Sequence, residues 1–183
     1  MVYMILADGF EEIEAVAPLD IIRRADIEIL TVSLANDLLV RGGHDIYVQA
    51  DITLDKIDFD ALDMLVLPGG LGGVEAIGGN RAAMDLISRV WKANKKLAAI
   101  CAAPSLLVGL GILDGKSVVS HPGVADKIEA AGGRLHPELP AVSDNNLITG
   151  KAAGTSIDFG LEIVAALRDR KTADELRRAI FYS

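Results

Sequence analysis

Strand-like and helix-like segments alternate along the whole chain, and this alternation limits the possible folds more than any other feature. Short apolar runs without helical period predict buried strands, and longer segments with apolar residues at helical spacing predict helices. The predicted strands cover residues 2–7, 28–34, 64–67, 97–100 and 117–120, with hairpins at 38–49 and 141–149. The predicted helices cover residues 11–24, 80–94, 123–131, 154–168 and 172–180, and a further helix starts at Pro104. Such alternation implies right-handed βαβ units, and therefore an α/β fold with a doubly wound, mostly parallel sheet.

Single residues refine these boundaries. Pro18 lies inside the first predicted helix, so we expect that helix to be kinked or divided there. Asn80 is suited to cap the helix that follows it, because its side chain can accept a backbone hydrogen bond. Gly132 and Gly133 are typical of a helix end.

Length and composition restrict the class of protein. The 183 residues, 51% of them apolar, suit one domain that spans residues 1–183. A single cysteine excludes an internal disulfide and favours a cytoplasmic location. A net charge of −8 argues against nucleic-acid binding, and no apolar run approaches the roughly 20 residues that span a membrane. We also see no signal peptide before the strand that starts at Val2.

The candidate site lies where the predicted strands end. In doubly wound sheets, ligands bind at the carboxyl ends of the strands. Four segments meet there: residues 8–14, 68–70, 101–102 and 121–122.

Cys101 is the candidate nucleophile at this edge. It ends the apolar run 97–100, and Pro104 is suited to the first turn of a following helix. Free N–H groups and the positive end of the helix dipole would favour its thiolate. The alternative is a buried and inert cysteine.

Glu14 is the candidate acid and base. Glu11 and Glu12 suit an acidic helix start that faces water, whereas Glu14 has a position that faces inward. Burial raises the pKa of a carboxyl group, and a protonated glutamate could donate to a thiolate and then exchange protons with a substrate.

Backbone groups could complete the site. The amides of Gly69 and Gly70, with that of Ala102, could form an oxyanion hole, although residues 68–70 could also be an ordinary tight turn. His121 is the histidine placed at this edge, and its alternative role is to cap or pack before Pro122. No spacing of ligands predicts a metal site, no phosphate-binding loop occurs, and we expect no cofactor.

Several motifs in one order resemble the ThiJ/PfpI superfamily. They are the segments Asp8-Gly-Phe-Glu-Glu-Ile-Glu14, Leu67-Pro-Gly-Gly70, Ala99-Ile-Cys-Ala-Ala-Pro104, Ser120-His-Pro122 and Gly154-Thr-Ser156. The chain is most similar to the branch that contains protein deglycases and bacterial ThiJ-type proteins. The resemblance implies a flavodoxin-like fold related to class I glutamine amidotransferases, and a homodimer that uses the first helix, with Arg23 and Arg24 at its end.

The resemblance also implies roles for single residues. Cys101 corresponds to the oxidisable nucleophile, Glu14 to the buried acid beside it, Gly70 and Ala102 to backbone donors, and His121 to a nearby histidine that is not a strict triad partner.

Some positions depart from related sequences. PfpI-type proteases carry histidine directly after the cysteine, where this chain has Ala102. His136-Pro137-Glu138 is a poor match to the late His-X-Glu pair of amidotransferases. His44 and Lys151 stand where the deglycase branch has arginines.

Three functions compete on this evidence. The first is a cofactor-free glyoxalase or deglycase that forms a hemithioacetal at Cys101 with a small α-oxoaldehyde or its adduct on a glycated protein. The second is an oxidation sensor or holdase that uses the same cysteine. The third, which Ala102 disfavours, is a PfpI-type protease or amidase.

Overall fold

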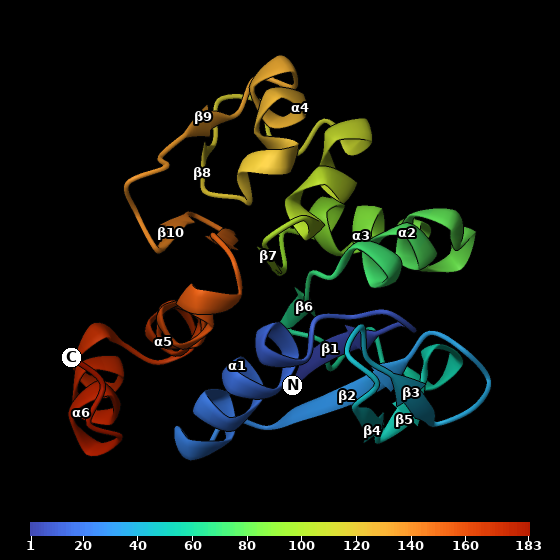
Figure 1. Ribbon diagram of the computed structural model, residues 1–183, viewed down its shortest axis with the longest axis horizontal. Coiled ribbons are helices and arrows are strands. Elements are labelled where there is room, and N and C mark those ends of the chain that lie inside the picture. The colour runs from blue at the N-terminus through green and yellow to red at the C-terminus, as the bar shows by residue number, and fades with distance from the viewer.

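The computed structural model describes all 183 residues and has one large central sheet (Figure 1). Its strands run in the order β10-β11-β7-β6-β1-β2-β5. Their bounds are β1 Val2–Leu6, β2 Ile29–Ser33, β5 Ile52–Thr53, β6 Met64–Leu67, β7 Lys96–Ile100, β10 Ala141–Asp144 and β11 Leu147–Gly150. All neighbouring strands are parallel except the β10–β11 hairpin at one edge.

Helices cover both faces of this sheet, as the alternation predicts. Helices α1 (Glu12–Arg24) and α5 (Ser156–Leu167) lie side by side on one face (Figure 1), where Ile22 and Phe159 are fully buried. The other face carries α2 (Leu71–Gly79), α3 (Arg81–Lys92), η2 (Ala103–Leu110) and α4 (Ala125–Ala130). The remaining helices are η1 (Leu54–Lys56), η3 (Pro122–Val124), η4 (Ala153–Thr155) and α6 (Arg170–Ala179). This is the predicted doubly wound, flavodoxin-like α/β fold.

Two small sheets lie outside the large one. The predicted hairpin near Gly42 and Gly43 forms β3 (Leu39–Arg41) and β4 (Tyr47–Gln49), which pair antiparallel. The Gly9 amide donates to the Arg41 carbonyl at 2.8 Å, and the Gly43 amide donates to the Phe10 carbonyl at 2.8 Å. These bonds hold the hairpin against the loop that leads into α1.

The structure corrects several expectations. The predicted strand 117–120 shortens to β8 (Ser117–Val118), which pairs with β9 (Arg134–Leu135) and not with the large sheet. The helix after Cys101 is 3₁₀ and not α, and helix α2 was not predicted because Gly72, Gly73, Gly78 and Gly79 weaken its helical pattern.

Pro18 neither divides nor ends α1, which runs unbroken from Glu12 to Arg24. The tight packing of α5 is the physical reason, since a Cβ added at Gly160 would lie 3.1 Å from Pro18 Cα and 3.0 Å from Ile21 Cβ. None of the helices is both long and apolar enough to cross a membrane.

Candidate active site

Cys101 occupies a strained turn at the end of β7. Its φ is +64°, a left-handed conformation that costs a residue with a side chain about 1–3 kcal/mol. The Cys101 amide donates to the Gly150 carbonyl at 3.0 Å, and the His121 amide donates to the Cys101 carbonyl at 2.9 Å. The turn is therefore fixed on both sides, and it leaves the thiol half-buried rather than enclosed in the core.

Glu14 faces inward from the first turn of α1, as predicted, and only 1% of it is exposed. Its Oε2 atom is buried and has no hydrogen-bond partner. Burial raises the pKa of Glu14 to about 7, and the negative charge of Glu11 adds to the rise, while contacts with the Cys101 thiol and the Gly69 backbone oppose it. A carboxyl with such a pKa can hold or release a proton near neutral pH.

The ionisation of the thiol and that of the carboxyl in this pair are coupled, because each negative charge disfavours the other. Burial raises the pKa of Cys101 to about 12, and the charge and hydrogen bond of Glu14 contribute to the rise. This direction is opposite to the one expected from a helix N-terminus, because desolvation and the adjacent carboxylate outweigh the backbone donors. Two neighbouring anions are unfavourable, so the pair carries a single negative charge above neutral pH and shares the remaining proton.

The glycine turn after β6 shapes the space around this pair. A Cβ on Gly69 would collide with Glu14 Oε2 and lie 2.8 Å from Cys101 Cβ. Gly70 has a φ of +89°, which glycine adopts without strain. The backbone of Gly70 and that of Ala102 lower the pKa of Cys101 and so favour its anion, whereas the Gly69 backbone lowers the pKa of Glu14. Gly70 and Ala102 thus line the pocket beside Cys101, and Gly69 lies close to Glu14.

His121 lies beside Cys101 but also has the capping role considered from the sequence. Its Nδ1 accepts a hydrogen bond from the Gly123 amide at 3.1 Å. In the neutral ring the proton is therefore on Nε2, which makes the free edge of the imidazole a donor and not a base. His121 follows a short strand that lies outside the large sheet. The hydrogen bond from its amide to the Cys101 carbonyl holds it beside the site.

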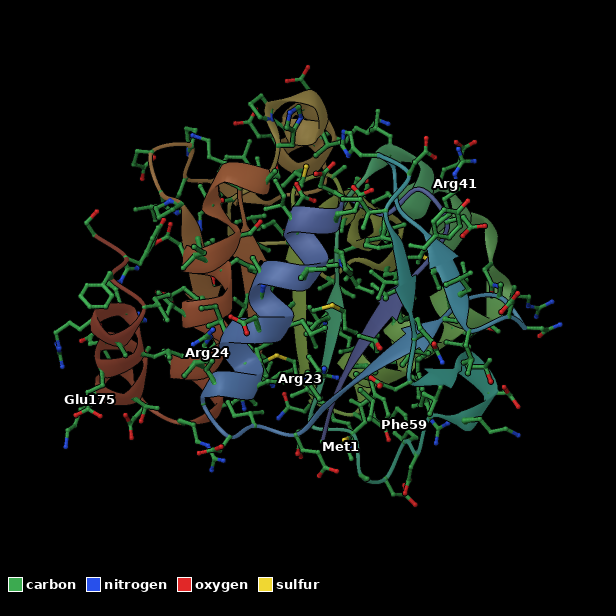
Figure 2. All side chains as sticks on the ribbon, turned by 60° about the horizontal axis from the view of Figure 1, so that its bottom comes forward. Met1, Arg23, Arg24, Arg41, Phe59 and Glu175 are labelled. Carbon is green, nitrogen blue, oxygen red and sulfur yellow. The ribbon has the colours of Figure 1, made fainter.

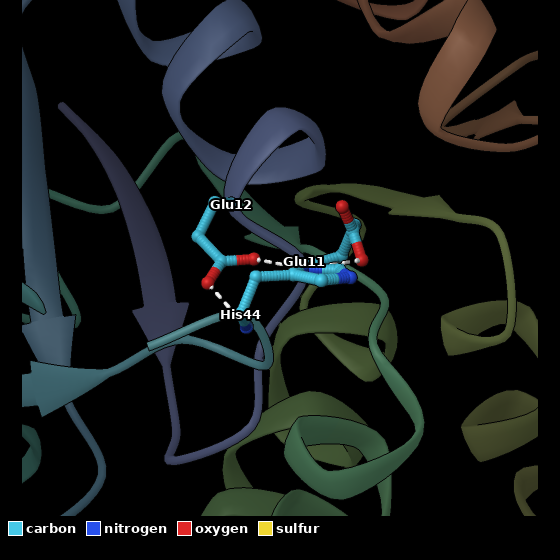
Figure 3. Close-up of side chains that lie close together, drawn as sticks. All are labelled: Glu11, Glu12 and His44. Carbon is cyan, nitrogen blue, oxygen red and sulfur yellow. Dashed lines mark hydrogen bonds and ion pairs between the residues drawn. The ribbon is translucent and has the colours of Figure 1, made fainter. Parts of the chain in front are cut away.

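A second cluster joins Glu11, Glu12 and His44 beside the Cys101 pocket (Figure 3). The Glu12 carboxyl accepts from the His44 amide at 2.6 Å and contacts His44 Nδ1 at 2.8 Å, and Glu11 lies 3.6 Å from the same nitrogen. The expectation that Glu12 faces water is wrong, since the β3–β4 hairpin covers it and leaves 5% exposed. Helical spacing could not reveal this long-range contact.

Hydrogen bonds set the charges in this cluster. Burial alone would raise the pKa of Glu12, but the bonds from the ring and amide of His44 lower it to about 2. The same ring bond, with the charges of Glu11 and Glu12, raises the pKa of His44. The three residues offer ligand atoms within 4.8 Å of one another, which is a spacing that a metal ion could use. Internal hydrogen bonds already account for their arrangement.

The space in front of Cys101 is a small pocket of about 200 Å³. Its lining consists of Glu11, Glu14, Gly70, Leu71, Cys101, Ala102 and His121. Leu71, which the sequence did not single out, directly follows Gly70 and is 81% exposed at the rim. A hollow of about 410 Å³ near Leu54 and Phe59 is larger, but neither a cysteine nor a histidine lines it.

Two other residues are not in this pocket. Lys151 donates from Nζ to the Pro137 carbonyl at 2.7 Å, so its amino group is bound elsewhere. His136 pairs with Glu138 at 3.4 Å, and neither residue lines the Cys101 pocket.

Comparisons with known proteins identify the family. A sequence profile described as the DJ-1/PfpI family matches residues 1–166. Protein dj-1beta of Drosophila melanogaster is 33% identical, and the match covers 97% of this chain and 94% of that protein. Deglycase TK1284 of Thermococcus kodakarensis is 30% identical, with 91% of this chain and 99% of that protein covered. The chain spans less than half of the length of two Arabidopsis thaliana relatives, protein DJ-1 homologs A and B.

Solved structures agree as well. The crystal structure of Drosophila melanogaster DJ-1beta superposes with a TM-score of 0.92 at 32% identity, and covers 100% of this chain and 97% of that one. The crystal structure of the C103A mutant of a DJ-1 superfamily protein from Salmonella typhimurium superposes with a TM-score of 0.90 at 35% identity, and covers 100% and 98%.

Proposed function

This chain belongs to the DJ-1/PfpI family, and we propose that it is a cysteine-dependent, cofactor-free enzyme that converts α-oxoaldehydes into 2-hydroxy acids. One observation carries the proposal: a buried carboxyl with a free oxygen, Glu14 Oε2, lies against the thiol of Cys101. A carboxyl so placed can move protons on a carbon atom that is bonded to the sulfur.

The first step is addition of the thiol to the aldehyde. The Cys101 sulfur forms a bond to the aldehyde carbon, and the thiol proton passes through Glu14 to the aldehyde oxygen. The amides of Gly70 and Ala102, which already contact the sulfur, stabilise negative charge during this addition. The product is a hemithioacetal.

The second step is an isomerisation of the hemithioacetal, in which the former aldehyde carbon is oxidised and the neighbouring ketone is reduced. The Glu14 carboxylate removes the proton from the former aldehyde carbon, and the electron pair reduces the neighbouring ketone through an enediol. Glu14 then returns the proton to the former ketone carbon. The hydroxyl proton of the former aldehyde carbon moves to the former ketone oxygen, which leaves a thioester of a 2-hydroxy acid on Cys101. Water hydrolyses this thioester and restores the thiol, so no outside oxidant or reductant is needed.

Adducts of oxoaldehydes on proteins are candidate substrates of the same site. A relative carries the name deglycase, which supports this extension. The open rim beside Leu71 and the half-buried thiol also favour access by a carbonyl group attached to a larger molecule.

The test is methylglyoxal consumption with detection of lactate, without added cofactor. Wild-type protein should form lactate, and Cys101→Ala and Glu14→Gln should each reduce the rate by at least about a hundredfold. Glu175→Gln on the distant helix α6 is the matched control and should keep full activity (Figure 2). Full turnover by Cys101→Ala would refute the proposal.

An oxidation sensor or holdase is the second candidate. A sulfinic acid on Cys101 could accept a hydrogen bond from protonated Glu14, and oxidized DJ-1 of Toxoplasma gondii is among the similar solved structures. Mass spectrometry after mild peroxide treatment distinguishes this function: a sensor requires a stable gain of about 32 Da on Cys101, which corresponds to two oxygens.

A PfpI-type protease remains the weakest candidate, because Ala102 follows the cysteine and His121 Nδ1 is already engaged.

We also propose that the protein is a homodimer that uses α1. Ile13 and Val16 on α1 are 55% and 45% exposed, and Ile46 of the hairpin is 57% exposed beside them. Neighbouring exposed apolar side chains of this kind favour association. Sedimentation that gave the monomer mass of 19.3 kDa would reject the homodimer.

A further inference from the structure

We infer that Glu11, together with His44, acts as a charge filter at the mouth of the Cys101 pocket and selects uncharged carbonyl compounds over carboxylate-bearing ones. As a statement about substrates, this inference rests on the proposed function. As a statement about access to the thiol, it stands on the geometry of the pocket alone.

The lining of the pocket is acidic. Glu11 and Glu14 contribute carboxyl groups, and no lysine or arginine is present among the seven lining residues. Glu12 lies just behind Glu11 and keeps its charge, because His44 hydrogen-bonds to it. An anion that approaches Cys101 therefore meets carboxylates within a space of about 200 Å³.

Glu11 is the residue that can discriminate between ligands. Its side chain is 20% exposed, so it can interact with a ligand in the mouth, whereas Glu12 is 7% exposed. Glu14 is 1% exposed and lies against the thiol, so it is less accessible to a ligand in the mouth. Within the chain, Glu11 has no lysine or arginine within 4.0 Å, and its ion-pair contact is with His44 Nδ1 at 3.6 Å, which is charged when the ring is protonated.

His44 sets the strength of the filter. The β3–β4 hairpin holds its exposed ring between the two carboxyl groups (Figure 3). A protonated ring offsets part of their charge. Removal of the charge of Glu11 and removal of the charge of His44 should therefore shift selectivity in opposite directions.

Cys101 makes this inference directly measurable, because it is the only cysteine of the chain. Iodoacetamide and iodoacetate have nearly the same size but differ by one negative charge. Each forms a bond between the Cys101 sulfur and its carbon and releases iodide. The ratio of their rates on the folded protein, divided by the same ratio for 2-mercaptoethanol, reports the charge at the mouth, and any change in thiol pKa cancels.

For the wild-type protein, the normalised ratio of the iodoacetamide rate to the iodoacetate rate should exceed one. Glu11→Gln should lower the normalised ratio about fivefold at low salt, and His44→Gln should raise it. Glu11→Asp keeps the charge and should keep the ratio, and Glu175→Gln makes the same change of net charge on the distant helix α6. The inference fails if Glu11→Gln leaves the ratio unchanged, if it acts no more strongly than Glu175→Gln, or if His44→Gln lowers the ratio.

A substrate pair extends the test to turnover. Uncharged 2-oxopentanal and anionic 4,5-dioxopentanoate are α-oxoaldehydes of similar length. The kcat/KM of the wild type should be higher for the uncharged compound than for the anionic one by more than their intrinsic chemical reactivities differ. Glu11→Gln should bring the two kcat/KM values closer together. Absence of Cys101-dependent turnover of both compounds would refute the proposed function, while the alkylation ratio would still decide the inference.

Discussion

At the scale of single residues, the site depends on a proton shared by two buried groups. The pKa values of Glu14, about 7, and of Cys101, about 12, are both raised, so only one of the two groups is ionised across most of the physiological range. The reactive form has the anion on sulfur and the proton on the carboxyl group. It is in equilibrium with the form that has the proton on the sulfur and the negative charge on the carboxyl group.

Glu14→Gln should separate thiol reactivity from catalysis. Removal of the carboxylate removes its charge and its hydrogen bond, which are two of the three causes that raise the pKa of Cys101. Alkylation of Cys101 by iodoacetamide at pH 7.5 should therefore become faster, while lactate formation is lost. Slower alkylation together with lost turnover would show instead that Glu14 is needed to form the thiolate.

The same pair predicts the pH dependence of the wild type. Turnover should rise with pH through an apparent pKa of about 7, as the pair loses its first proton.

Stability should change with pH in the opposite sense to turnover, because a carboxyl whose pKa is raised in the folded state disfavours folding as it ionises. The free energy of unfolding should fall between about pH 4.5 and pH 7. The melting temperature of Glu14→Gln should exceed that of the wild type at pH 8 but not at pH 4.5.

Gly69→Ala tests the close approach of the glycine turn to the pair. Its Cβ would collide with Glu14 Oε2 and meet Cys101 Cβ at 2.8 Å, so catalysis should be lost and stability should fall by about 1–3 kcal/mol. Gly79→Ala is the matched control, because nothing lies within 4 Å of the added atom. Urea unfolding and lactate formation measure the two effects, and equal behaviour of the two variants would contradict the expected collision.

At the scale of helices and strands, local signals decide what the sequence can predict. Asn80 accepts from the Ala83 amide at 3.1 Å and caps α3, as expected from the residue alone. Both hairpins also lie where turn residues predict them. Tertiary contacts decided the rest: α5 packs against an unbroken α1 at Pro18, and the β3–β4 hairpin buries Glu12.

The candidate site was predictable to a similar degree. Strand ends place Cys101, the glycine turn and Glu14 at one edge, and Glu14 does face inward. The sign of the shift in the Cys101 pKa was not predictable, since it depends on how closely a buried carboxyl approaches the sulfur. The participation of His44 was also hidden, because it depends on the folding of the hairpin onto the loop before α1.

Asn80→Ala tests the cap of α3. Loss of the side-chain acceptor should lower the free energy of unfolding by about 1 kcal/mol, without loss of activity. Asn80→Asp keeps an acceptor and should restore most of the stability. Urea unfolding gives both values, and equal destabilisation by the two variants would mean that the cap does not act through this hydrogen bond.

At the scale of the whole molecule, exposed apolar residues distinguish one face. Ile13 and Val16 of α1 lie beside Ile46 of the hairpin, whereas Phe181, 95% exposed, lies after α6 at the C-terminal end of the chain. Arg23 and Arg24 end the same helix (Figure 2). Their ion pairs, with Asp51 and Asp20, lie within the chain.

Ile13→Arg should dissociate the proposed dimer, because a charge placed in an apolar contact must lose its hydration without gaining a partner. Sedimentation should show the wild type at twice the chain mass of 19.3 kDa and the variant at the chain mass itself. Phe181→Arg introduces the same charge at a more exposed apolar position beyond the end of α6, outside the group formed by Ile13, Val16 and Ile46, and it should remain dimeric. If both variants dissociate, the effect comes from net charge, and if neither does, α1 is not the contact. Since Ile13 directly precedes Glu14, turnover by a monomeric Ile13→Arg would further show that the Cys101 site is complete within one chain.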